Sequence, residues 1–305
     1  MRLIVLGSGS KGNATLVEAG ATRVLIDNGF SCTELLARLR AVGVAPESIG
    51  ALLLTHEHND HVGGAGVLAR RLNIPVYGNV PTLRAAEARL GEVPCLKEFD
   101  TGDTFAFEAL EIHAFSLSHD TADPVGFTLS DGRRRIGCCT DTGRITRLAR
   151  HELAACDALI LEANHDVDML RSGPYPLPLQ QRVLSSQGHL DNPTALDLAA
   201  ELAADRLRRL VLAHLSETNN HPDLVRREIT ARRELLAGVE IHIASQHRPT
   251  PWMEVGAGCK ARALQNGLQD SFAPIFSHPP SHSPCQALPP RVKDNQDLFH
   301  PLTSI

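Results

Sequence analysis

Residues 55–64 read THEHNDHVGG, so three histidines and two acids fall within six consecutive positions. The stretch follows a short apolar run and precedes two glycines. In an extended backbone, residues two apart share a face, so the imidazoles of His56 and His58 can reach one point. Asp60 and His61 lie where the chain turns into a helix, and they can reach a second point close by. Because imidazole and carboxylate together suit zinc, manganese or iron, this stretch predicts a metal site.

Other strand ends offer candidates for the remaining ligands. The four side chains of this stretch cannot complete the coordination of two cations, so further histidines or acids are expected elsewhere. Three residues fit, because each follows an apolar run as His56 does: His119 in SLSHD, Asp141 in CCTDTG and His214 in LVLAHLS. The seven cysteines show no Cys-x-x-Cys spacing, so a thiolate metal site is not expected.

A carboxylate and a histidine outside these ligands predict a proton donor. Glu162 ends the apolar run ALILE, and His189 lies just before a helix. Backbone N–H groups and the helix dipole favour an anion at that point. The dipole would lower the pKa of His189, and a neighbouring carboxylate would offset this effect. We expect Glu162 to be that carboxylate.

The order of strand and helix signals predicts two packed sheets. Short apolar runs end in glycine or Asp-Gly turns and indicate strands. Helix signals lie between them, including an N-terminal cap at Asn192 followed by Pro193. A mixed β/α segment is followed by a β-rich middle, from about residue 94 to residue 140, and then by a second β/α segment. Two sheets packed together with helices on both outer faces would bury these elements.

The expected strands lie at residues 2–7, 14–20, 22–29, 50–56, 74–78, 103–110, 110–119, 125–132, 133–141, 157–164, 209–214, 239–244 and 251–255. The expected helices lie at residues 32–42, 62–72, 81–90, 145–154, within 165–185, and at 192–204 and 222–236.

Composition limits the class of protein. The 305 residues carry a formal net charge of -5, so a global basic surface is not expected. Composition alone therefore does not indicate a nucleic-acid partner. No apolar run is long enough to span a bilayer and no secretory signal is visible, so we expect a cytoplasmic protein without a membrane partner. After about residue 257 the sequence is rich in Pro, Ser and His and has no periodicity. We therefore expect one domain over residues 1–256 and a disordered tail over residues 257–305. Nothing in the sequence indicates the oligomeric state.

Taken together, these motifs resemble the metallo-β-lactamase superfamily. Within it the chain is most similar to the YycJ/WalJ family, whose members are described as metal-dependent DNA exonucleases. The similarity covers about residues 1–256. The stretches that carry it are LGSGSKGN, LLLTHEHNDHVGG, GVLARRLNIPVYGN, SHDTADPVGF, TDTG, LEANHDVDMLRSGPYP, GHLDN and LAHLSETNN.

The resemblance implies a four-layer αββα sandwich of the α/β class. Two divalent cations, manganese or zinc, would lie at one edge between the sheets. Glu162 and His189 match the positions that phosphodiesterase relatives such as ribonuclease Z use beside the leaving group. The resemblance also implies two ligand sets joined by one bridging residue: His56, His58 and His119 for one cation, Asp60, His61 and His214 for the other, and Asp141 between them.

The predicted chemistry is hydrolysis of a phosphodiester. The two cations would lower the pKa of a shared water, and the resulting hydroxide would attack phosphorus in line. Asp60 would orient that hydroxide and take its proton, while the cations would absorb charge on the phosphoryl oxygens. His189, backed by Glu162, would donate a proton to the departing oxygen. The expectation of a DNA substrate, and of exonuclease activity, comes from the resemblance and not from charge.

One segment after the Glu162 strand offers candidate substrate contacts. Residues 171–182 read RSGPYPLPLQQR and could form a loop over the site. In such a loop Arg171, Tyr175 and Arg182 would touch phosphate or base. An ordinary solvated proline loop explains the same residues.

Three alternatives fit part of the sequence. A different hydrolase on the same fold would act on RNA, a cyclic phosphodiester or a thioester, although Glu162 with His189 favours phosphodiesters. GSGSKG at residues 7–12 matches Gly-x-Gly-x-x-Gly, and Asp27 follows about 20 residues later, as in a non-catalytic dinucleotide-binding module. That motif must open a helix, however, and the residues that follow predict a hairpin. A metal-binding regulatory protein without turnover is the third alternative, and the complete ligand set argues against it.

Overall fold

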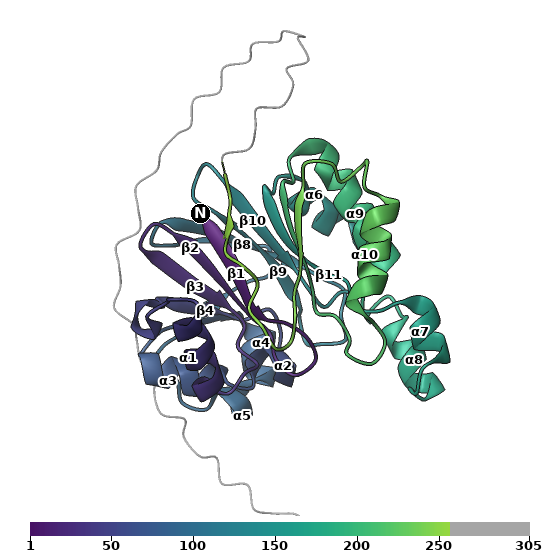
Figure 1. Ribbon diagram of the computed structural model, residues 1–305. Helices are drawn as coiled ribbons and strands as arrows, with labels where there is room; N and C mark the ends of the chain where they lie inside the picture. The colour runs from purple at the N-terminus through teal and green to yellow at the C-terminus, as the bar shows by residue number, and fades with distance from the viewer. Residues whose placement is uncertain (257–305) are drawn as a thin grey trace, which may run out of the picture. The chain divides into compact units, whose positions relative to one another are not determined.

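The computed structural model describes residues 1–256. The tail expected over residues 257–305 lies outside the described residues. The described part forms two seven-stranded sheets that pack face to face, with helices on both outer faces (Figure 1). The expected αββα sandwich is therefore confirmed. Within residues 1–256, no helix combines the length and apolar character needed to cross a membrane.

The first sheet contains the first six strands and the last one. Its order is β14-β1-β2-β3-β4-β5-β6, antiparallel from β14 to β3 and parallel from β3 to β6. The sequence patterns predict every strand of this sheet except β6, whose side chains are mostly half-exposed and do not alternate. The bounds are β1 (Arg2–Gly7), β2 (Ala14–Ala19), β3 (Thr22–Ile26), β4 (Ala51–Leu53), β5 (Val76–Asn79), β6 (Leu96–Phe99) and β14 (Met253–Glu254).

The second sheet repeats this arrangement. Its order is β13-β12-β11-β10-β9-β8-β7, antiparallel from β7 to β10 and parallel from β10 to β13. The carboxyl ends of its parallel strands share one edge, where ligands bind in open α/β sheets. The bounds are β7 (Thr104–Phe107), β8 (Leu110–Ser116), β9 (Val125–Ser130), β10 (Arg135–Cys139), β11 (Ala158–Glu162), β12 (Arg209–Ala213) and β13 (Glu240–Ile243).

Alternation along the strands divides the core into layers. In β1, Leu3 and Val5 belong to the cluster between the sheets, whereas Ile4 and Leu6 pack among the helices outside. The neighbouring cysteines of β10 also enter different clusters. Since both faces of each sheet are covered, the inner strands read as continuous apolar runs.

The helices cover the two outer faces. Figure 1 shows α1 and α3 beside the first sheet and α6, α9 and α10 beside the second. The bounds are α1 (Cys32–Ala41), the 3-10 helix η1 (Pro46–Ser48), α2 (Asn59–Val62), α3 (Ala65–Leu72), α4 (Val80–Ala85), α5 (Glu87–Leu90), α6 (Arg147–Ala154), α7 (Val167–Ser172), α8 (Leu177–Val183), α9 (Asn192–Asp205) and α10 (Pro222–Ala231).

Several helices differ from the prediction. The helix expected over residues 81–90 is divided into α4 and α5, the one expected over 62–72 begins at Ala65, and the one expected over 222–236 ends at Ala231. The cap of α9 is Asp191, whose side chain accepts the N–H of Thr194. Asn192 is fully buried and its amide donates to Asn220 instead. Both residue types favour capping, so tertiary contacts of Asn192 decide which of the two caps the helix.

Three of the non-glycine residues with a left-handed backbone follow strands at one edge of the sheets. Asp27 after β3, Asp141 after β10 and His214 after β12 have φ values of 60°, 61° and 55°. This conformation is uncommon outside glycine, although Asp and His adopt it more often than most residues. All three side chains lie in the site described below, so local backbone strain coincides with the functional edge.

The glycine-rich loop between β1 and β2 leads into a strand. The hairpin β2–β3 follows it, so the helix that a dinucleotide-binding motif requires at this point does not form. Instead the loop contacts the histidine-rich stretch. The N–H of Asn13 donates to the carbonyl of Asp60 at 2.8 Å, and its Nδ2 lies 3.0 Å from Nε2 of His61.

A close backbone contact generates a prediction about stability. A Cβ added at Gly29 would lie 1.9 Å from the carbonyl oxygen of Asp60. Gly29→Ala should lower the free energy of unfolding by about 1–3 kcal/mol, because the backbone beneath Asp60 must move. Denaturant titration measures this change. Gly256→Ala is the control, since no atom of residues 1–254 lies within 4 Å of its added Cβ. Equal stability of the two variants would contradict the prediction.

Candidate active site

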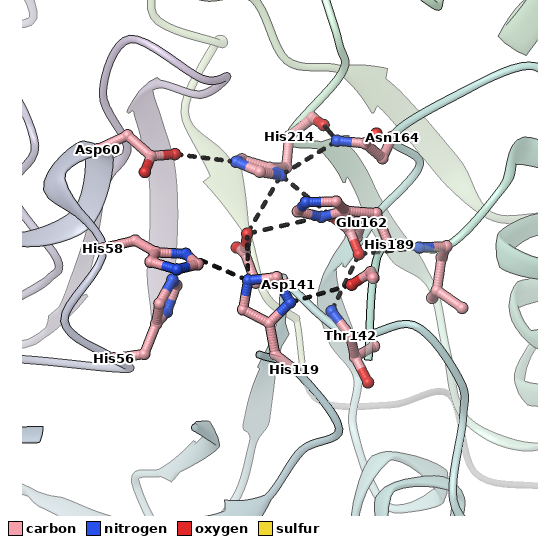
Figure 2. Close-up of polar contacts among 12 residues, drawn as sticks. His56, His58, Asp60, His119, Asp141, Thr142, Glu162, Asn164, His189 and His214 are labelled. Carbon is pink, nitrogen blue, oxygen red and sulfur yellow. Dashed lines mark hydrogen bonds and ion pairs between the residues drawn. The ribbon is translucent and has the colours of Figure 1, made fainter. Parts of the chain in front are cut away.

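Four of the seven predicted ligands line a cavity at the edge where the two sheets face each other, and the other three are buried beside it. The cavity has a volume of about 200 Å³. Its lining includes His58 and Asp60 from the segment after β4, and Asp141 and His214 from strand ends of the second sheet. Figure 2 shows these side chains pointing toward one another from the two sides. The cavity therefore lies where ends of both sheets converge.

The side chains of the predicted ligand sets lie close together. In each of three groups, the candidate ligand atoms are all within 4.8 Å of one another. Two groups correspond to the sets that the family resemblance implies, and the third contains the implied bridge. The groups are His56, His58 and His119; Asp60, His61 and His214; and His56, His61 and Asp141.

Asp141 lies at the centre of these groups. Its Oδ2 is 3.2 Å from Nε2 of His61. Its Oδ1 is 3.4 Å from Nδ1 of His214 and 3.9 Å from Nε2 of His119. The Asp141 side chain is only 2% exposed, so water cannot solvate its negative charge. Neighbouring imidazoles or bound cations must compensate that charge.

The donor set fits a zinc or manganese ion. Nδ1 of His56 lies 3.0 Å from the hydroxyl of Thr55, but its Nε2 is buried and has no hydrogen-bond partner among residues 1–256. A buried polar atom without a partner is costly, and coordination of a cation would satisfy it. Imidazoles with a shared carboxylate are suitable ligands for both metals.

Asp27 belongs to the site, although the sequence pattern did not predict it there. Its Oδ2 lies 2.8 Å from Nδ1 of His61 and accepts a hydrogen bond from the hydroxyl of Thr55. Because a carboxylate only accepts, His61 donates from Nδ1 and leaves Nε2 toward Asp141. Asp27 thus sets the tautomer and orientation of His61. The available signal was an acid directly after an apolar strand, the signal that identified Asp141.

A backbone carbonyl orients His119 in a similar way. Its Nδ1 lies 3.0 Å from the carbonyl oxygen of Gly188, which leaves Nε2 for the cluster. That nitrogen is 3.3 Å from Nδ1 of His58. The contact ties the loop after β8 to the segment that precedes His189, so two predicted site residues depend on one hydrogen bond.

Glu162 and His189 form the pair expected from the sequence. Oε1 of Glu162 is 2.7 Å from Nδ1 of His189, and it is also 3.0 Å from Nδ1 of His214 (Figure 2). Its Oε2 accepts the N–H groups of Thr142 and Leu190. The contact with His214 was not expected. One buried carboxylate therefore orients both the candidate proton donor and a candidate ligand.

Comparison with known proteins agrees with this geometry. Residues 22–215 match the beta-lactamase superfamily domain. Exodeoxyribonuclease YycJ of Bacillus anthracis is 35% identical over 253 residues, which cover 81% of this chain and 96% of the relative. Exodeoxyribonuclease WalJ of Streptococcus pneumoniae is 34% identical over 260 residues, which cover 82% of this chain and 97% of the relative. The chain belongs to the YycJ/WalJ family of the metallo-β-lactamase superfamily.

Solved structures support the fold of this family member. The metallo-β-lactamase fold protein YhfI from Bacillus subtilis has a TM-score of 0.64 at 19% identity, covering 82% of this chain and 98% of that protein. The short form of human tRNase Z has a TM-score of 0.56 at 19% identity, covering 84% of this chain and 100% of that protein. The family match and the two relatives above confirm the resemblance inferred from the motifs.

Two of the three predicted substrate contacts line the cavity, and the third does not. Tyr175, just before α8, and Arg182 on α8 line the cavity. Arg171 is exposed on α7 and is not part of the lining. In Figure 1 α7 and α8 lie together, apart from the helices that cover the second sheet.

Burial and close opposite charges determine how the site residues titrate. Burial disfavours charge on His214, but the charge of Asp141 and the hydrogen bonds that His214 donates to Asp60 and Glu162 raise its pKa to about 10. Burial likewise opposes the raised pKa of His61, which nearby aspartates hold well above its usual value. Burial alone would raise the pKa of Glu162, but the charge of His189 and the hydrogen bonds from His189 and His214 outweigh burial and lower this pKa to about 2. These shifts favour imidazolium groups, which neutralise the buried carboxylates.

The pKa of His189 also differs from the value expected from the helix dipole alone. Burial lowers this pKa, but the charge and hydrogen bond of Glu162 raise it above the usual value. The carboxylate expected to offset the dipole therefore dominates, and it favours the protonated, proton-donating form of His189.

Removal of the Asp27 carboxylate should weaken metal binding. Asp27→Ala frees the His61 ring to rotate and to change tautomer, so metal affinity should fall about 10- to 100-fold. Competition with a chromophoric chelator measures this change. Asp157→Ala is a matched control, because Asp157 is also buried but pairs with Arg206. Asp157 directly precedes β11, whereas Glu162 ends that strand, so the control lies at the end away from the site. That control should destabilise the fold and leave metal affinity unchanged. Equal affinity losses in both variants would show that Asp27 acts only through stability.

Metal binding should release protons at pH 7. The raised pKa values of His214 and His61 favour their protonated forms at pH 7, and a ligating imidazole must be neutral. Affinity should therefore fall as pH falls. Titration calorimetry in buffers of different ionisation enthalpy measures the release, with His242→Ala as a control because His242 contacts only Glu240 in the described hydrogen bonds. Proton uptake, or no dependence on buffer, would contradict the assignment.

Proposed function

We propose that this chain is a metal-dependent phosphodiesterase that removes nucleotides from the ends of DNA. One observation carries the proposal: Glu162 and His189 form a hydrogen-bonded pair beside the seven candidate ligands. A phosphodiesterase needs a proton donor for the departing oxygen, and His189 lines the cavity. The two relatives named exodeoxyribonuclease, at 35% and 34% identity over most of their length, support DNA as the substrate.

Two divalent cations, manganese or zinc, would be held by the clustered side chains. Such cations lower the pKa of coordinated water and stabilise negative charge on phosphoryl oxygens. The buried Nε2 of His56, which has no hydrogen-bond partner in the described part of the chain, supports this assignment. The proposed sets are His56, His58 and His119 for one cation, Asp60, His61 and His214 for the other, and Asp141 as the bridge. All of these residues lie within residues 1–256, which we propose as the hydrolase domain.

Asp60 would act both as a ligand and as a proton acceptor. Its Oδ2 lies 3.2 Å from Nε2 of His214 and 3.5 Å from Nε2 of His61. Asn13 donates to the same oxygen at 3.3 Å. The side chain is 21% exposed at the cavity wall, so it can also contact water. This position suits a carboxylate that orients the attacking water and accepts its proton.

His189 would protonate the departing oxygen. Its Nδ1 contacts Glu162, so Nε2 is the ring atom left for the substrate. Glu162 stabilises the imidazolium form and holds the ring in one orientation. Tyr175 and Arg182 are proposed substrate contacts because they line the same cavity. No contact is proposed for Arg171.

Degradation of end-labelled DNA by the metal-loaded protein tests this function. The wild type should shorten DNA progressively from an end with manganese or zinc, and DNA should be preferred over RNA, cyclic phosphodiesters and thioesters. His189→Ala should lower kcat by about 10²- to 10⁴-fold while metal content stays unchanged. His58→Ala should lose both metal and activity.

Two outcomes would contradict the proposal in different ways. Full turnover by His189→Ala would remove the leaving-group role. Degradation of RNA without degradation of DNA would overturn the substrate class. His242→Ala, in the strand β13 and outside the cavity lining, should behave as the wild type in every assay.

A further inference from the structure

Arg182 occupies a distinctive place in the cavity. Among the described residues that line it, Arg182 is the only lysine or arginine. Its side chain is 56% exposed, so the guanidinium lies toward the mouth and not on the buried floor. A phosphodiester strand that enters the cavity carries more than one negative charge, and the candidate cations neutralise only the phosphate that is cleaved. The remaining phosphates need another cationic group.

The position of Arg182 is held by Asp120. Nε of Arg182 donates to Oδ2 of Asp120, and the two side chains form an ion pair. Oδ1 of Asp120 lies 3.5 Å from Nε2 of the adjacent His119, a candidate ligand. The guanidinium therefore pairs with a carboxylate that directly neighbours the candidate ligands.

Two more contacts hold the same two segments together. The hydroxyl of Ser118 donates to the carbonyl of Ser186 at 2.8 Å. Nδ1 of His119 lies 3.0 Å from the carbonyl oxygen of Gly188. Residues 118–120 thus each contact the segment 182–188. The loop that supplies the candidate ligand His119 therefore also fixes the position of Arg182. Such coupling is expected if substrate binding requires a fixed distance between Arg182 and the candidate ligands.

The guanidinium keeps donors available for a ligand. Only its Nε has a hydrogen-bond partner among residues 1–256, so the two terminal nitrogens are not engaged by the described protein. A guanidinium presents its donors in a planar fork that matches the oxygens of a phosphate. Asp120 binds one edge of this fork and orients the other edge.

We propose that Arg182 binds a second phosphate of the nucleic acid, next to the phosphate that is cleaved, and that Asp120 is the positioning residue for Arg182. This inference rests on the proposed phosphodiesterase function and names a subsite of that site. The phosphate is either the neighbouring internal diester or a terminal phosphate at the end of the strand. Tyr175 and Leu179 line the cavity together with Arg182, so the same nucleotide would meet aromatic and apolar surface.

Substrates that lack one negative charge test the subsite directly. One oligonucleotide series carries a single neutral methylphosphonate at successive linkages from the labelled end, and a second series carries either a phosphate or a hydroxyl at each terminus. For the metal-loaded wild type, one of these changes should lower kcat/KM by about 10- to 100-fold, as expected for loss of a charged hydrogen bond. The series that shows the loss identifies the phosphate as internal or terminal.

Variants then assign the effect to the pair. Arg182→Ala should lower kcat/KM for the charged substrate by a similar factor, mainly through KM, and should no longer distinguish charged from neutral phosphate. Arg182→Lys should recover part of the loss, because it keeps the charge but not the fork. Asp120→Asn should raise KM with unchanged metal content, and the double variant Asp120→Asn with Arg182→Ala should be no worse than Arg182→Ala alone.

A matched control separates the subsite from a general effect of losing an exposed ion pair. Arg150 pairs with Glu201 between α6 and α9 and is 45% exposed, and neither residue lines the cavity. Arg150→Ala should keep the wild-type preference for charged phosphate. If Arg182→Ala also keeps that preference at every linkage and terminus, the inference is wrong. If Asp120→Asn impairs the protein equally with and without Arg182, the positioning role is wrong.

Binding without turnover distinguishes failure of the inference from failure of the proposed function. Fluorescence anisotropy with a labelled oligonucleotide, in the manganese-loaded His189→Ala background, measures affinity as a function of salt. Additional loss of Arg182 should reduce the slope of log K against log salt by about one. A wild type that binds DNA but degrades nothing contradicts the proposed function alone. An unchanged slope in a protein that degrades DNA contradicts only the inference, and a wild type that binds no oligonucleotide contradicts both.

Discussion

The burial of the Asp141 carboxylate among imidazoles is the constraint on which the rest of the site depends. At 2% exposure this side chain has no access to water, and a buried charge of this kind is tolerated only with close opposite charge. His61, His119 and His214 approach it from different parts of the chain. The imidazoles that surround the Asp141 carboxylate are also suitable ligands for a divalent metal, so the arrangement that stabilises the buried charge can also bind a cation.

The backbone is shaped to bring these groups together. Asp141 and His214 both follow inner strands of the second sheet in a left-handed conformation. Gly29 and Gly64 allow two backbone approaches that a Cβ would prevent, to Asp60 and to Phe30. Most side chains that point into the cluster therefore come from strand ends or from tightly packed turns. Such positions have little freedom, which favours a preorganised site.

Hydrogen bonds around the ligands divide their roles. Asp27 and the carbonyl of Gly188 each engage one nitrogen of a histidine and leave the other for the cluster. Glu162 instead contacts both His189 and His214. A change in the charge of Glu162 would therefore change the pKa of the candidate proton donor and of a candidate ligand together. The proton chemistry and the metal chemistry of the site are coupled through it.

The sequence by itself determined the two-sheet sandwich and the candidate ligands, because apolar strand runs and the spacing of His56, His58, Asp60 and His61 are local patterns. It also identified Glu162 and His189 as partners, since each follows a recognisable signal at the end of a strand or the start of a helix. The tertiary structure alone decided that Asp27 orients His61, that Glu162 also reaches His214, and that Asp120 holds Arg182 over the cavity. Each of these contacts joins residues more than 30 positions apart, and local periodicity carries no information about which strand ends and loops meet across the sheets.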